Sequence, residues 1–322
     1  MDISVIIPTL NRSGSLRKAV SSACKQTFET ERYEIVVVDN GSTDHTAEVT
    51  RQIVRSSNKS VRYVYEARLG LHNARNAGVR AARGDILVFT DDDATFHRKW
   101  LRAYADAFRK YPDMVAAGGP VRAIWEAPPP VWLLNYIGDR KRFGVFSLME
   151  PDGECGIGSD NVFFGVNMAI RRSVFQKTGF HPELVGNRTI GDGESGLGND
   201  IRKSGGLIGH VPEAIVYHHI SSSRMSVAYI RKWAWHLGAT EMYGSWRHRR
   251  RGVIAIAKEA IRVIGDYWRN WLRAYLVRQR RDRRAIDLQF QASLGWSKLV
   301  YLWWMLTDPL VQQALDMWDF RP

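Results

Sequence analysis

The stretch Ile86-Leu87-Val88-Phe89-Thr90-Asp91-Asp92-Asp93-Ala94 decides the fold, because an apolar run ends abruptly in three consecutive carboxylates. A short β-favouring run without polar alternation is typical of a strand that is buried on both faces, as in a parallel sheet. Ionised carboxylates are costly to bury without partners, so the aspartates must emerge where the strand ends. In open α/β sheets this carboxyl edge is where ligands bind.

The three aspartates predict a cation site. Adjacent negative charges repel one another, and a divalent cation relieves that repulsion. Carboxylate oxygens suit Mg²⁺ or Mn²⁺, which commonly bridge to substrate phosphates. The alternative is an acidic turn or helix N-cap, in which Asp93 or Thr95 caps a segment that begins near His97. The apolar strand before the aspartates favours the metal site.

Strands alternate with helices along the N-terminal half of the chain. This alternation predicts a doubly wound, largely parallel sheet with helices on both faces. A further apolar strand is expected at 211–216, after the helix that follows residue 194. The other predicted strands are 3–7 (stopped by Pro8), 35–38, 61–65 and 86–89, and the helices between them are 15–27, 47–54 and 71–82.

Polar residues follow the first two strands at the same predicted sheet edge. Thr9, Asn11 and Arg12 follow the first strand, and Asp39 follows the second. Arg75 lies on the helix before the fourth strand. The glycine-rich dinucleotide and P-loop fingerprints are absent from the sequence. A bound phosphate group would therefore have to be neutralised by metal and arginine.

Four motifs in order resemble the family 2 glycosyltransferases of the GT-A fold. They are Ile6-Ile7-Pro8-Thr9-Leu10-Asn11-Arg12, Val37-Val38-Asp39-Asn40-Gly41-Ser42-Thr43-Asp44, Ala74-Arg75-Asn76-Ala77-Gly78 and Phe89-Thr90-Asp91-Asp92-Asp93. The resemblance covers residues 1–120 and implies a nucleotide-sugar donor.

The resemblance also implies roles for single residues. Thr9 and Asp39 match positions that contact the nucleoside, and Arg75 matches one near the donor. Asp91 would face the ribose or the metal, and Asp93 would ligate the metal. We expect Asn11, Arg12 and Asp92 in the donor site as well. The plainer alternatives are a turn-forming aspartate for Asp39 and a surface helix residue for Arg75.

A glycine-rich segment, 190–205, carries the predicted base. Family members often have Glu-Asp here, with Leu three and Gly eleven residues after the Asp; Leu197 and Gly205 have that spacing from Glu194. The resemblance therefore places Glu194 at the catalytic position, where a carboxylate deprotonates the acceptor hydroxyl. Asp192 is the other candidate. The alternative for both is a helix N-terminus that favours acidic residues. The family's usual arginine in this helix is replaced by Asp200.

The predicted strand 211–216 leads to Tyr217-His218-His219. The resemblance to GT-A enzymes implies that His218 supplies a nitrogen ligand to the same cation. The alternative is that these residues are merely polar groups at a strand end.

The C-terminal third is basic and rich in tryptophan. Residues 221–322 contain 18 Lys and Arg against 8 Asp and Glu, a net charge of +10 out of +13 for the chain. They also contain nine of the twelve tryptophans. Amphipathic helices of this kind indicate either an anionic membrane surface or packing on the catalytic domain. Without a recognised nucleic-acid-binding module, we do not expect nucleic acid as a partner.

These observations combine into one interpretation. Residues 1–220 form an α/β GT-A catalytic domain, and residues 221–322 form a basic, Trp-rich helical extension. The expected function is inverting transfer from a UDP-sugar to a hydroxyl of a glycan or lipid-linked acceptor, with Mg²⁺ or Mn²⁺ on Asp91, Asp93 and His218. The alternatives are a sugar nucleotidyltransferase and a nucleotide-sugar-binding membrane scaffold without catalysis.

The expected location is the cytoplasm, with or without peripheral attachment to the inner face of the membrane. Two cysteines provide no disulfide framework, the first residues do not resemble a signal peptide, and no apolar run is long enough to span a bilayer.

Overall fold

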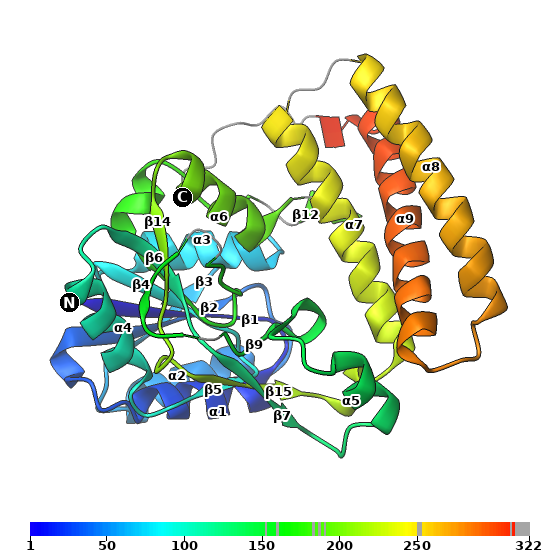
Figure 1. Cartoon of the computed structure of the whole chain (residues 1–322). Helices are drawn as coiled ribbons and strands as arrows, with labels where there is room; N and C mark the ends of the chain where they lie inside the picture. The colour runs from blue at the N-terminus through cyan, green and yellow to red at the C-terminus, as the bar shows by residue number, and fades with distance from the viewer. Residues whose placement is uncertain are drawn as a thin grey trace.

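The computed structural model describes residues 1–322 except 152, 159–160, 182–183, 186–187, 190, 250–252, 310 and 313–322. A sheet-based part and three long C-terminal helices lie side by side (Figure 1).

The main sheet confirms the mostly parallel α/β prediction. Its strand order is β10-β14-β6-β11-β4-β1-β2-β3. Strands β4, β1, β2 and β3 run parallel, and β11 is antiparallel to both of its neighbours. The strands are β1 Ile3–Thr9, β2 Tyr33–Asp39, β3 Val61–Tyr65, β4 Ile86–Phe89, β6 Met114–Gly118, β10 Gly156–Ile157, β11 Met168–Arg171 and β14 Leu207–His210.

Helices cover both faces of this sheet. Val5 and Ile7 of β1 pack toward the side that α1 and α4 cover, whereas Ile6 packs toward α3 and α6. Each strand is therefore buried on both faces, which explains its continuous apolar sequence. The helices of this part are α1 Ser13–Cys24, α2 Thr46–Ser56, α3 Leu71–Ala81, α4 Trp100–Lys110 and α6 Gly193–Lys203, with short 3₁₀ turns η1 Thr30–Arg32 and η3 Arg172–Gln176.

Strand β1 continues through Pro8, where the sequence predicted a stop. The pairing of β1 with β4 ends at Ile6, but its pairing with β2 continues to Thr9 opposite Asp39. The N–H that Pro8 lacks would face a place where β4 has already ended, so no ladder hydrogen bond is lost.

A second sheet of five strands lies below the carboxyl edge of the first, in the order β5-β15-β7-β9-β8. One of its strands corrects a sequence-based boundary. The predicted strand 211–216 is wrong, because the chain turns at Pro212 between β14 and β15, and His218 lies within β15. The segment 121–149 supplies three strands of this sheet and a helix. The elements are β5 Ala94–Phe96, β7 Val121–Trp125, β8 Arg142–Phe143, β9 Leu148–Met149, β15 Val216–Ile220, α5 Val131–Ile137 and η2 Gly144–Phe146.

The C-terminal extension is helical, as predicted. It consists of α7 Val227–Arg249, α8 Val253–Leu276 and α9 Arg283–Thr307, preceded by η4 Ser222–Arg224. Helix α9 packs against both α7 and α8, and α8 is the outermost of the three (Figure 1). An apolar cluster that includes Phe146, Ile230 and Ile286 joins the extension to the second sheet. In the described part of the chain, no helix is long and apolar enough to cross a membrane. A two-stranded ribbon, β12 Leu184–Val185 and β13 Arg188–Thr189, completes the described elements.

Candidate active site

Three aspartates lie at the carboxyl edge of β4, beside the ends of β1 and β2; Asp91, Asp92 and Asp93 are called the strand-end triad from here on. Asp92 and Asp93 share Arg12 as a partner, and Asp91 pairs with Arg75. Asp92 is only 4% exposed, accepts a hydrogen bond from Thr9 Oγ1 at 2.7 Å and pairs with Arg12 at 3.1 Å. Burial raises the pKa of Asp92 to about 6, although Arg12 opposes that shift. Asp92 thus ties the loop after β1 to the end of β4.

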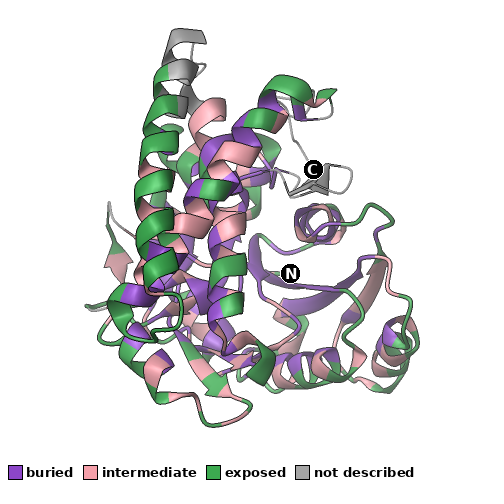
Figure 2. Ribbon diagram, turned by 90° about the vertical axis from the view of Figure 1, so that its right-hand side faces the viewer, coloured by how far each residue is buried: buried purple, intermediate pink, exposed green. Residues whose placement is uncertain are grey.

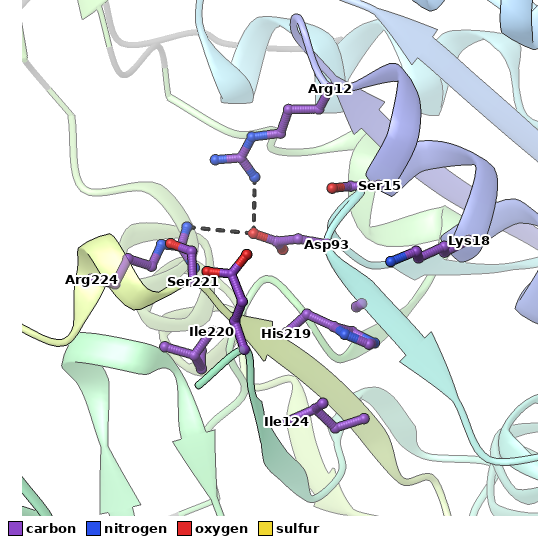
Figure 3. Close-up of a pocket in the computed structure, with 11 residues that line it drawn as sticks. Arg12, Ser15, Lys18, Asp93, Ile124, His219, Ile220, Ser221 and Arg224 are labelled. Carbon is purple, nitrogen blue, oxygen red and sulfur yellow. Dashed lines mark hydrogen bonds and ion pairs between the residues drawn. The ribbon is translucent and has the colours of Figure 1, made fainter. Parts of the chain in front are cut away.

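Asp93 is surrounded by cationic groups. Arg12 Nη1 lies 2.9 Å from Oδ2, Arg224 Nη2 lies 3.5 Å from the same oxygen, and His218 Nε2 lies 3.3 Å from Oδ1. Burial opposes ionisation of Asp93, but the His218 hydrogen bond and the neighbouring positive charges outweigh it and lower its pKa. Figure 3 shows Arg12 reaching Asp93 from above and Arg224 reaching it from the left.

The tautomer of His218 suits a metal ligand. Its Nδ1 donates to the Phe146 carbonyl at 2.8 Å, so its Nε2 presents a lone pair toward Asp93 Oδ1. Two electron-rich atoms that face each other in this way need a proton or a cation between them. Arg224 Nη1 lies 3.2 Å from the same Nε2, and contact with Asp93 raises the pKa of His218 although burial alone would lower it.

The donor set fits a cation that completes its coordination with phosphate oxygens. Within the described residues, no three His, Cys, Asp or Glu side chains are arranged as a ready-made metal site. Asp93 and His218 form a pair of one oxygen and one nitrogen donor, which leaves several coordination positions for water and phosphate oxygens. The third predicted ligand, Asp91, pairs instead with Arg75 Nη2 at 3.3 Å.

Two residues expected in the donor site, Asp39 and Asn11, lie at the end of β2 and just after β1. Asp39 is buried and accepts hydrogen bonds from the Ser42 N–H at 2.9 Å and the Tyr63 hydroxyl at 2.8 Å. Asn11 has φ +54°, a left-handed conformation that asparagine tolerates, and its Oδ1 accepts the Thr43 N–H at 2.7 Å. Both residues therefore shape the loops that follow β1 and β2.

Glu194 lies in the first turn of α6 and faces α3; residues 191–194 are called the Glu194 turn from here on. Arg75 Nη1 lies 3.1 Å from Glu194 Oε1, and the same guanidinium pairs with Asp91. Arg75 is 1% exposed, whereas about a third of the Glu194 side chain is accessible. Burial would raise the pKa of Glu194, but the charges of Arg75 and His72 lower it to about 2. Glu194 is therefore ionised at neutral pH.

His72 is a site residue that sequence reasoning missed. Its Nε2 lies 3.9 Å from Glu194 Oε2, and its ring stacks on Phe180 with centroids 5.8 Å apart. Nδ1 is buried and has no hydrogen-bond partner in the described part of the chain. A signal was present in the sequence, because His72 is three residues before Arg75 on one helix and so shares its face.

Asp192, the other candidate base, is held by the C-terminal extension. It is 4% exposed and accepts two hydrogen bonds from Arg247 Nη1 of α7, at 3.1 and 3.0 Å. Arg247 also pairs with Asp200, which occupies the position of the family's usual arginine. Nothing in the sequence pattern connects Arg247 with residues 192 and 200.

A cavity of about 410 Å³ opens beside Asp93 (Figure 3). The loops and helix after β1 contribute Arg12, Ser15 and Lys18, and the turn after β15 contributes Ser221 and Arg224. Its cationic wall next to the Asp93–His218 pair suits a diphosphate. Lys18 and Arg224 were not among the residues that the sequence suggested.

Comparison with known proteins places this site in context. Residues 4–179 match the family model described as glycosyl transferase family 2. Glycosyltransferase AglE of Haloferax volcanii is 30% identical over 181 residues, which is 56% of this chain and 56% of the relative. The match thus spans little more than half the length of that protein.

Two solved structures have a similar fold. The mannosyltransferase PcManGT from Pyrobaculum calidifontis, in complex with GDP-Man and Mn²⁺, has a TM-score of 0.55 and 20% identity, over 97% of this chain and 84% of that one. Staphylococcus aureus TarS 1–349, in complex with UDP-GlcNAc, has a TM-score of 0.55 and 14% identity, over 94% of this chain and 91% of that one. At these identities the likeness concerns the GT-A-like fold.

Proposed function

The chain belongs to glycosyl transferase family 2, and from that premise we propose that it transfers a sugar from a nucleotide sugar to an acceptor hydroxyl with inversion at the anomeric carbon. One observation carries the proposal: the buried Arg75 contacts both Asp91 of the strand-end triad and Glu194. A donor-side carboxylate and a candidate base are thereby held on two sides of one guanidinium.

The donor lies along the carboxyl edge of β1, β2 and β4. In this proposal the nucleoside contacts the walls formed by Thr9, Asn11 and Asp39, and the ribose faces Asp91. Arg75 lies next to the sugar, and Asp92 fixes Arg12 in place. Arg12, Lys18 and Arg224 supply positive charge to the diphosphate in the adjoining cavity. UDP is the expected nucleotide; TarS supports it through its complex with UDP-GlcNAc, whereas PcManGT was solved with GDP-Man.

Asp93 and His218 hold a Mg²⁺ or Mn²⁺ ion in this proposal, with Asp91 as the third ligand. The His218 tautomer and the presence of Mn²⁺ in PcManGT support it. When bound, the ion neutralises charge that develops on the leaving diphosphate. Asp91 has to turn from Arg75 to reach it, which would couple donor binding to the Arg75–Glu194 contact.

Glu194 is the proposed general base. It is ionised at neutral pH and partly accessible, so it can accept the proton of an incoming hydroxyl. Asp192 is nearly inaccessible and is bound to Arg247, which favours a positioning role for it. The proposed acceptor is a glycan or a lipid-linked glycan of the cell envelope.

The test incubates the chain of residues 1–322 with each of a panel of UDP- and GDP-sugars, in the presence of either Mn²⁺ or EDTA. We expect Mn²⁺-dependent release of nucleoside diphosphate from one donor, and a product of inverted anomeric configuration by NMR once an acceptor is supplied. Binding of nucleotide without turnover on any donor and acceptor would favour the scaffold. Release of pyrophosphate from a sugar phosphate and a nucleoside triphosphate would favour a nucleotidyltransferase.

A further inference from the structure

Helix α8 has an exposed apolar face that no element described in the structure covers. Its buried side, which includes Val263 and Ala274, packs on α9. The face next to it exposes large apolar side chains at helical spacing. They are Ile261, Ile264, Trp268, Trp271, Leu272, Tyr275 and Leu276, between 41% and 74% exposed. Figure 2 shows this outward side of α8 as largely exposed.

Aromatic contacts hold this face in place. The rings of Trp268 and Trp271 are 5.7 Å apart, and Trp271 stacks on Tyr275 at 5.8 Å. Trp296 of α9 extends the row through Tyr267, at 5.5 Å. Their large apolar rings carry polar N–H and O–H groups, a combination that suits the boundary between lipid and water.

Basic residues border the apolar face along α8 and at its end. Residues 261–284 contain eight arginines and two aspartates, a net charge of +6. Five of the arginines lie in the α8–α9 turn and the start of α9: Arg278, Arg280, Arg281, Arg283 and Arg284. Arg140, which follows α5, pairs with Asp287 near the start of α9 at 3.7 Å, and α5 exposes Val131 at 73%.

We propose that the apolar face of α8 and the arginines of the α8–α9 turn form a surface that binds an anionic lipid bilayer. Apolar and aromatic side chains enter the acyl boundary, and the arginines contact the headgroup phosphates. Charge argues against a second copy of the chain as the occupant, because a symmetric contact would bring two surfaces of the same positive charge together.

The experiment is flotation of the full-length protein with vesicles of phosphatidylcholine alone or mixed with phosphatidylglycerol. We expect binding to the anionic vesicles only, and a decrease as salt is added. The basic variant R278Q/R280Q/R281Q/R284Q should bind at least about a hundredfold more weakly, because each arginine near an anionic surface contributes about a fivefold gain. The apolar variant I264S/W268S/L272S should lose at least about tenfold.

A matched control removes the same charge elsewhere. R55Q/R83Q/R98Q/R172Q changes four exposed arginines of the sheet-based part and should bind within a factor of about two of the parent. Equal losses in the control and the basic variant, or no binding to anionic vesicles at low salt, would overturn the proposal. The proposal would also be overturned if the parent forms a dimer in sedimentation, the apolar variant is monomeric, and the parent does not bind vesicles. Vesicle binding requires no sugar donor, so its failure is separable from failure of the proposed transfer.

Discussion

The strand-end triad and the Glu194 turn are both acidic clusters held by arginine, but they are built differently. The carboxylates of the triad are consecutive residues after one buried strand, and the ends of β1 and β2 lie next to them. The Glu194 turn lies at the start of α6 and is held by Arg75 and His72 of α3 and by Arg247 of α7.

The two clusters also differ in how the surrounding charges affect their carboxylates. In the triad, neighbouring carboxylates have opposite pKa shifts, since burial raises that of Asp92 to about 6 while His218 and the arginines lower that of Asp93. In the Glu194 turn, one carboxylate is partly accessible and the other is buried in an ion pair. In the proposed function the triad binds an ion, and the turn keeps one carboxylate available and the other fixed.

The largest expected effect comes from removing the ion-binding member of the triad. Asp93→Ala removes the carboxylate that faces His218 Nε2 and should lower metal-dependent turnover by at least about ten-thousandfold, because a bound metal contributes several kcal/mol of charge stabilisation. Release of nucleoside diphosphate measures it. Asp113→Ala, an exposed residue of the loop before β6, is the control and should be fully active. Turnover by Asp93→Ala at the parent rate would refute the ion-binding assignment.

The next largest effect distinguishes the two carboxylates of the Glu194 turn. Glu194→Gln keeps the size of the side chain but removes its basicity, and should lower transfer about a thousandfold with donor affinity unchanged. Asp192→Asn weakens the contact with Arg247 and should mainly lower the melting temperature. Transfer is measured in single turnovers, donor affinity by titration, and the melting temperature by thermal unfolding. If Asp192→Asn stays folded and loses transfer while Glu194→Gln retains it, the two roles are exchanged.

The same contrast explains how much the sequence could predict. The triad and its strand are adjacent in the chain, so an apolar run followed by carboxylates was enough to predict the fold and one edge of the site. His72, Arg224 and Arg247 were missed because their partners lie far away in the sequence. Helical periodicity shows which face of a helix is polar, but the packing of α3 and α7 decides which carboxylate an arginine meets.

The error at 211–216 has a local cause. An apolar run was taken as one strand, although Pro212 divides it and starts a turn between β14 and β15. The backbone of this turn is held by Asn167. The side-chain amide of Asn167 donates to the carbonyls of Pro120 and Ala214, at 2.9 and 2.7 Å. Such a buried amide, which connects three loops, leaves no periodic signal in the sequence.

Arg75→Met tests the connection between the two clusters. Arg75→Met leaves Asp91 and Glu194 without their shared cation and should cost about 3 kcal/mol of unfolding free energy at pH 7. The pKa of Glu194 is below its unfolded value, so its stabilising contribution is present above about pH 4 and declines as pH falls toward 2. The difference between parent and variant should therefore shrink below about pH 4 in urea unfolding. Arg80→Met removes an exposed arginine of the same helix whose partner, Glu66, keeps its ion pair with Arg68, and should cost less than about 1 kcal/mol. Equal losses for Arg75→Met and Arg80→Met would show that Arg75 is not a buried connection.

The smallest effect concerns the contact of His181 with α7, near the Asp192–Arg247 pair of the Glu194 turn. His181 is 3% exposed and its Nδ1 lies 2.9 Å from the Tyr243 hydroxyl of α7. Burial, reinforced by Arg247, lowers the pKa of His181 to about 4. Because the unfolded chain binds this proton more readily, His181 lowers the unfolding free energy as pH falls from about 6.5 toward 4.

His181→Gln removes that titration and keeps a polar partner for Tyr243. Between pH 7 and pH 5, the parent should lose about 2 kcal/mol more unfolding free energy than the variant, as measured by urea unfolding at both values. His45→Gln is the matched control, since the His45 side chain is 86% exposed and its removal should leave the pH dependence of the parent unchanged. If His181→Gln and the parent have the same pH dependence, then His181 is accessible to protons in the folded chain. In that case, the contact between His181 and α7 opens readily in the folded chain.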